Sequence, residues 1–93
     1  MGRPYKLRRI NFNPTTTYFK PQGTPLRELR EVEIGSDELE AIRLKHIEKL
    51  DQIQCAKKMK VSPSTFQRIL LSANQKIAEA LTEGKAIKII KKL

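Results

Sequence analysis

The stretch KKMKVSPSTFQRIL (residues 57–70) contains the clearest helix start in the chain. Ser62 has the side chain of an N-cap, and Pro63 follows at the first helical position, where a missing N–H costs little. Apolar residues then recur at helical spacing until Gly84, a residue that commonly ends helices. We therefore expect one long helix over 63–83.

A second helix start lies a short distance upstream. Asp51, with Gln54 three residues later, forms a capping-box pattern, which predicts a short helix over 51–59. The small side chain of Ala56 suits a close crossing of the two helices. The connecting turn requires a positive φ near Lys60, where glycine is usual, so we expect some backbone strain at this residue.

A further helix is predicted over 37–48. Ser36 can act as its N-cap, and acidic residues in the first turn suit the positive end of the helix dipole. We expect the apolar face to pack on the core and the acidic side to be turned away from DNA. The apolar positions are Leu39, Ala41, Ile42, Leu44 and Ile47.

The two ends of the chain have different patterns. Residues 1–35 hold four of the five prolines, which predicts an extended basic arm that packs partly on the body. Residues 85–93 partly alternate apolar and basic side chains, as a strand does. Their partner is either the segment 32–34 or a second copy of the chain. The expected fold class is mainly α: a three-helix domain over 36–84 with an N-terminal arm and a short C-terminal strand.

Charge is unevenly distributed along the 93 residues. The net charge of +9 divides into +6 for residues 1–30, −3 for residues 31–50 and +6 for residues 51–93. Two basic regions around an acidic one are typical of a protein that presents one face to nucleic acid. The alternative is that the charge only keeps the protein soluble.

A short helix, a tight turn and a longer helix form the layout of a helix-turn-helix, whose second helix enters the major groove of DNA. Gln can form two hydrogen bonds with adenine and Arg with guanine, while Ser and Thr reach bases or phosphates. The candidates for base reading are Ser64, Thr65, Gln67 and Arg68, with Ser72 and Gln75 further along. The alternative is a helical hairpin whose polar face is only solvated.

Other basic and hydroxyl residues are candidates for phosphate contacts, which give affinity without sequence information. In the helical region these are Lys57, Lys58, Lys60, Ser62 and Lys76. In the arm, Arg3, Lys6, Arg8 and Arg9 either enter a minor groove or add non-specific affinity.

Enzymatic, metal-dependent and membrane functions have little support in the sequence. Cys55 is the single cysteine and is expected to be a small packed residue, while His46 is expected at the surface. No phosphate loop, catalytic triad spacing or metal-ligand cluster appears, so we expect no enzyme activity, cofactor or metal. No apolar run is long enough to cross a bilayer, and we expect a cytoplasmic, nucleoid-associated protein.

Six segments, in order, resemble the domain-of-unknown-function-134 family. They are GRPYKLRRI (2–10), FKPQGTP (19–25), DELEAIRL (37–44), MKVS (59–62), TFQRIL (65–70) and EGKA (83–86). That family consists of small prokaryotic proteins predicted to bind DNA, and its helical part is similar to region four of bacterial sigma factors. The similarity is clearest at EAIRL (40–44) and SPSTF (62–66). The resemblance implies a DNA-binding regulator of transcription.

The chain departs from the family pattern at Lys60, where the family has Gly, and at Asn74, where it has Arg. Longer members carry a cysteine-containing tail or a domain related to nitrogenase-cofactor proteins, which these 93 residues do not contain. We therefore expect none of the metal-dependent functions of those relatives.

The expected function is sequence-specific binding of double-stranded DNA, with the helix 63–83 in the major groove. Because one such module contacts few base pairs, a homodimer on two half-sites is expected. The alternative is an adaptor that contacts RNA polymerase or another regulator and binds DNA non-specifically. RNA binding has less support, because the chain lacks an aromatic platform for stacking single-stranded bases.

Overall fold

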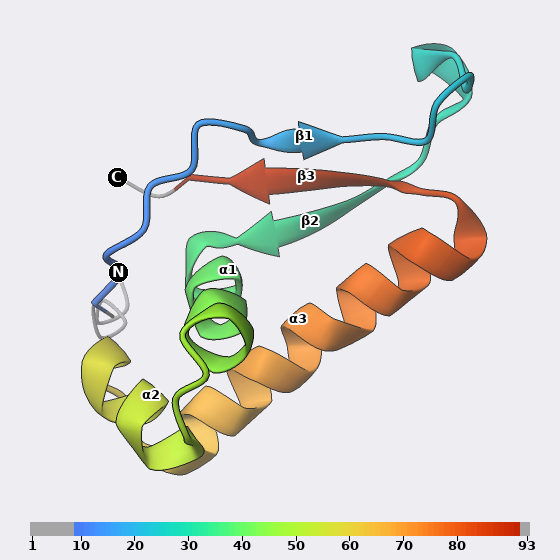
Figure 1. Ribbon diagram of the computed structural model, residues 1–93. Helices are drawn as coiled ribbons and strands as arrows, with labels where there is room; N and C mark the ends of the chain where they lie inside the picture. The colour runs from blue at the N-terminus through green and yellow to red at the C-terminus, as the bar shows by residue number, and fades with distance from the viewer. Residues whose placement is uncertain (1–8, 92–93) are drawn as a thin grey trace, which may run out of the picture.

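The computed structural model describes residues 9–91 of the chain. This part is mostly helical and carries a small three-stranded sheet, so the expected helical class is confirmed in its coarse form. The helices are α1 (Ser36–Ile42), α2 (Gln52–Met59) and α3 (Pro63–Glu83), and the strands are β1 (Tyr18–Phe19), β2 (Glu31–Gly35) and β3 (Ala86–Ile90). Helices α1 and α3 lie on one side of the sheet, and α2 packs on α3 farther from it (Figure 1).

The strands are placed differently from the prediction. The C-terminal strand β3 is the middle strand, with β1 antiparallel on one side and β2 parallel on the other. Residues 18–35 therefore supply both outer strands, in a segment for which the sequence predicted only an extended arm that packs partly on the body. In β2, Val32 and Ile34 are buried and lie opposite Ile87 and Ile89 of β3. The pairing of the C-terminal segment with residues 32–34 of the same chain is thus confirmed.

The first helix differs from the expected span of 37–48. Gly35, not Ser36, is the N-cap of α1, and the Gly35 N–H donates to Glu38 Oε1 at 2.8 Å. The Ser36 hydroxyl instead donates to the Ile90 carbonyl at 3.0 Å, which ties α1 to β3. After Ile42 the chain continues as a π-helical segment, η2 (Arg43–Ile47).

The two helix starts around the turn are as predicted. The Asp51 carboxylate accepts from the Gln54 N–H at 2.8 Å, and Gln54 Oε1 accepts from the Asp51 N–H at 3.1 Å. At the start of α3, Ser62 Oγ accepts from the Thr65 N–H at 3.1 Å. Lys60 ends α2 in the left-handed region with φ of 58°, which confirms the expected positive φ.

Replacing Lys60 with glycine is expected to raise the free energy of unfolding by about 0.5–1 kcal/mol. A left-handed φ costs an L-residue about 1–2 kcal/mol, and the greater freedom of glycine in the unfolded chain offsets part of the gain. Urea denaturation followed by circular dichroism measures the change. Lys58→Gly, inside α2, is the control and is expected to destabilise by about 1 kcal/mol. A destabilising Lys60→Gly would contradict the prediction.

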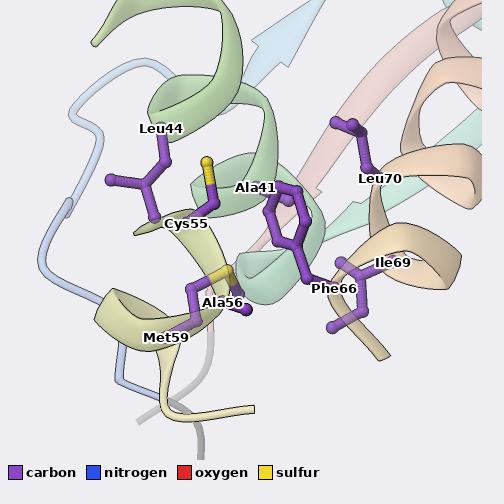
Figure 2. Close-up of a cluster of buried hydrophobic side chains, with 8 residues drawn as sticks. All are labelled: Ala41, Leu44, Cys55, Ala56, Met59, Phe66, Ile69 and Leu70. Atoms are coloured by element: carbon purple, nitrogen blue, oxygen red, sulfur yellow. The ribbon is translucent and has the colours of Figure 1, made fainter. Parts of the chain in front are cut away.

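The core lies where α1, η2, α2 and α3 meet (Figure 2). Phe66 is fully buried at the centre of this cluster, and the turn residues Leu50 and Val61 pack against its edge. The cluster consists of Ala41, Leu44, Cys55, Ala56, Met59, Phe66, Ile69 and Leu70. Two residues that the helical spacing assigned to apolar faces, Ile47 and Leu81, are instead exposed at 71% and 76%.

Candidate nucleic-acid interface

The first turns of α3 present polar side chains outward. Ser64, Gln67 and Arg68 are exposed, whereas Thr65 is half-buried. Thr65 Oγ1 accepts from the Ser62 hydroxyl at 2.9 Å and from Arg68 Nη2 at 3.2 Å. The Thr65 hydroxyl therefore orients the Arg68 guanidinium, while Ser64 and Gln67 are exposed on the surface of α3. Three of the four predicted base readers are therefore accessible. The fourth, Thr65, holds the side chain of Arg68 in place.

The turn brings the basic end of α2 beside the start of α3. Lys57, Lys58 and Lys60 are all exposed, and Gln52 Nε2 donates to the Pro63 carbonyl at 3.0 Å, which pins the two helix starts together. The sequence contains no acidic residue between Asp51 and Glu79. The side chains of residues 52–78 are therefore all positive or neutral, a charge pattern that attracts phosphates.

The described part of the arm reaches this surface at one point. The Arg9 N–H donates to the Met59 carbonyl at 3.1 Å, so Arg9 lies at the C-terminal end of α2, and its side chain is exposed. The other predicted arm contacts, Arg3, Lys6 and Arg8, lie outside the described residues.

Two residues assigned to DNA contacts are turned toward α1 instead. Ser72 Oγ donates to Glu38 Oε2 at 2.6 Å, and Lys76 Nζ binds Glu38 Oε1 at 2.9 Å. Burial by itself would raise the pKa of Glu38, but hydrogen bonds from Ser72, the Gly35 N–H and Lys76 outweigh it and hold the pKa below its usual value. Glu38 thus joins α1 to α3. Gln75, the other candidate further along α3, is exposed.

Replacing Glu38 with glutamine is expected to lower the free energy of unfolding by about 1–2 kcal/mol at pH 7. Because the folded-state pKa is depressed, the stability from this carboxylate is present above its unfolded pKa of about 4.3 and is lost as pH falls through the folded value. Urea titrations at pH 7 and near pH 3 measure the difference between wild type and variant. That difference is expected to shrink at the lower pH; a constant difference would contradict the assigned ionisation.

A second buried acid stabilises the other side of α1. Glu40 is 1% exposed and binds Arg43 through two hydrogen bonds, from Nε at 3.1 Å and from Nη2 at 3.0 Å. The Asn11 N–H donates to the same carboxylate at 3.1 Å, and the Arg43 guanidinium lies 5.7 Å from the centre of the Phe12 ring. The wider turn of η2 also brings Glu48 within 3.1 Å of Arg43 Nη1.

Glu38 and Glu40, on the acidic side of this helix, are both buried, at 8% and 1% exposed. Both carboxylates are buried because each has charged or hydrogen-bonding partners that replace water. The i,i+3 spacing of Glu40 and Arg43 was a signal for one of these pairs in the sequence. Nothing local in the sequence indicated the side-chain partners of Glu38, Ser72 and Lys76, which lie more than thirty residues away.

Other candidate reactive groups lie as expected. Cys55 is fully buried, and burial raises the pKa of its thiol, so it is a packing residue with an unreactive sulfur. His46 is exposed. Within residues 9–91, no three side chains of the His, Cys, Asp and Glu types gather closely enough to hold a metal ion. None of the helices in this part combines the length and apolar character needed to span a bilayer.

The fold and surface define a small, mostly helical protein with a three-stranded sheet and a basic two-helix face. The chain belongs to the DUF134 family, described as a protein of unknown function, whose model matches residues 1–92. It is 57% identical over 89 residues to a UPF0251 protein of Clostridium botulinum, 56% identical over 89 residues to one of Clostridium tetani, and 53% identical over 88 residues to one of Halothermothrix orenii.

These matches cover 96%, 96% and 95% of this chain, respectively. They cover 57%, 60% and 65% of the three relatives, so the chain spans about three fifths of their length. No solved structure matches the chain.

Proposed function

We propose that the protein binds double-stranded DNA in a sequence-specific manner and regulates transcription, with α2 and α3 as a helix-turn-helix. The observation that carries this proposal is the exposed polar start of α3 beside three exposed lysines, on a stretch without acidic residues. In this arrangement, the N-terminal turns of α3 enter the major groove and the lysines contact the phosphates on its rim.

The local structure supports this role for α3. The Thr65 N–H in its first turn donates to the Ser62 cap, and the Gln52 side chain binds the Pro63 carbonyl, which links the start of α3 to α2. The fully buried ring of Phe66 fixes the helix to the core directly behind Gln67 and Arg68. A rigid support of this kind holds the side chains in position for base edges, where each bidentate contact discriminates by about 1–3 kcal/mol.

Replacing Arg68 with alanine is expected to weaken binding to the preferred DNA sequence by about 5- to 150-fold, corresponding to 1–3 kcal/mol, and to relax preference at one base position. Lys57→Ala is expected to weaken all double-stranded DNA about equally and to reduce the salt slope by about one. Fluorescence anisotropy with selected and scrambled duplexes measures both effects. Lys88→Ala, an exposed lysine on the sheet, is the control and is expected to change neither.

The competing function is that of an adaptor for RNA polymerase or another regulator. If Arg68→Ala and Lys57→Ala weakened selected and scrambled duplexes to the same extent, sequence-specific reading by α3 would be contradicted. Copurification with polymerase, together with DNA binding lost at moderate salt, would then favour the adaptor.

A further inference from the structure

One face of α3 is exposed along the length of the helix and has a regular pattern. Its residues are separated by alternating steps of four and three positions, the spacing of a coiled-coil seam. This face, the α3 stripe, consists of Gln67, Leu71, Asn74, Ala78 and Leu81. All five are exposed, and the two leucines reach 54% and 76%. In Figure 1, one long side of α3 faces away from the sheet, and no element of the described residues lies next to that side.

The α3 stripe contains no charged residue, in a protein where 31% of the residues are charged. Along one edge of it, Gln75 and Thr82 are also uncharged, and the one charged residue of that row, Arg68, lies toward the N-terminal end of α3. Near its C-terminal end, the Lys85 ammonium is bound by Glu79 and Glu83, so its charge is compensated within the chain. Two copies of a +9 protein can therefore approach at this face without placing like charges opposite each other.

The stripe is complementary to itself when two helices run in opposite directions. Leu71 and Leu81 lie equally far from Lys76 along the helix, and so do Asn74 and Ala78, each pair on either side of it. In an antiparallel pair centred at this level, Leu71 of one copy packs on Leu81 of the other, and Asn74 meets Ala78, so the four positions from Leu71 to Leu81 each have a partner, while Gln67 lies beyond the paired segment. We propose that the α3 stripe joins two copies of this chain as an antiparallel helix pair.

A single helix–helix contact buries less surface than the 1,200–2,000 Å² or so of a standard stable interface, so the dimer is weak, with a dissociation constant on the order of micromolar to tens of micromolar. Its geometry also suits DNA. Ser64 lies about twelve residues from the centre of the pair, or roughly 18 Å at 1.5 Å per residue. The two helix starts are then about 36 Å apart, close to one turn of B-DNA. Only this match to the DNA turn rests on the proposed function; the dimer itself does not.

Sedimentation velocity without DNA, over about 1 to 200 micromolar protein, tests the dimer. Leu71→Lys and Leu81→Glu are each expected to weaken association by about tenfold or more, since a charge then faces a leucine. The double variant is expected to restore it, because the new ammonium of each copy faces the new carboxylate of the other. Ile53→Lys, at an apolar residue of α2 that is 63% exposed, is the control and is expected to leave association unchanged.

A wild-type protein that stays monomeric throughout this range would overturn the proposal, and so would association unaffected by both single variants. A double variant that associates no better than the single ones would exclude the antiparallel register. Because both leucines are exposed, the variants are expected to unfold at nearly the wild-type temperature, which circular dichroism checks. The experiment contains no DNA, so its outcome is independent of DNA binding.

Discussion

Replacing Phe66 with alanine is expected to lower the free energy of unfolding by about 3–5 kcal/mol. The Phe66 ring is fully buried and belongs to the cluster that joins α1, α2 and α3. A chain of this length has a total stability of roughly 5–14 kcal/mol, so the loss is a large share of it. The cavity would open where the two helices of the proposed DNA-binding unit meet, and we therefore expect loss of their fixed geometry as well.

Thermal and urea denaturation followed by circular dichroism measure this effect. Ile53→Ala is the matched control, because this side chain is 63% exposed and its truncation is expected to change stability by less than about 0.5 kcal/mol. Equal losses in the two variants would contradict the assignment of Phe66 to the centre of the core.

Replacing Arg43 with methionine is expected to destabilise the protein by about 3–5 kcal/mol, because the buried Glu40 carboxylate loses its only cationic partner among the described residues. The same change removes the contact of the guanidinium with Phe12 and the ion pair with Glu48. Asn11 then remains bound to an uncompensated charge.

Two comparisons separate the buried pair from ordinary surface charge. Arg27→Met is expected to cost less than about 0.5 kcal/mol, because the side chains of Arg27 and Glu28 are both exposed, at 81% and 62%, and their charged groups lie 3.9 Å apart. A double variant, Glu40→Leu with Arg43→Met, is expected to recover part of the stability by removing the unpaired charge. Urea denaturation measures all three variants. A double variant less stable than Arg43→Met would contradict a buried, charge-compensating pair.

The helices around the turn could be predicted because their signals are local. The caps at Asp51 and Ser62, the proline at the first position of α3 and the positive φ of Lys60 each depend on residues within one turn. The burial of Phe66 and Cys55 followed from helical spacing and residue type. For the same reason, the exposed polar start of α3 was visible in the sequence.

The sheet and the buried acids depend on contacts between distant parts of the chain. β1 and β2 lie in a proline-rich segment, and only β3, more than fifty residues later, gives them a shared partner. Ser36 has the side chain of a cap, but its hydroxyl donates to the Ile90 carbonyl of the distant strand β3, and Gly35 is the cap. Lys76 was assigned to phosphates because its neighbour Glu38 is far away in sequence.

Leu81 is a residue that was predicted to be buried and is instead exposed. Helical spacing assigned it to the core, yet it lies on the exposed side of α3, beside the buried Ala80, and is 76% exposed. Spacing alone reports that a helix has an apolar face but does not report which neighbour covers it. In the proposed dimer, the cover is a second copy.

The measurement that tests the DNA-binding function most directly is selection from a randomised double-stranded DNA library by the purified protein, read by sequencing at two salt concentrations. We predict an enriched motif that persists at the higher salt, because contacts to bases are less sensitive to salt than contacts to phosphates. Absence of an enriched motif, with all binding lost at the higher salt, would contradict sequence-specific recognition by α3.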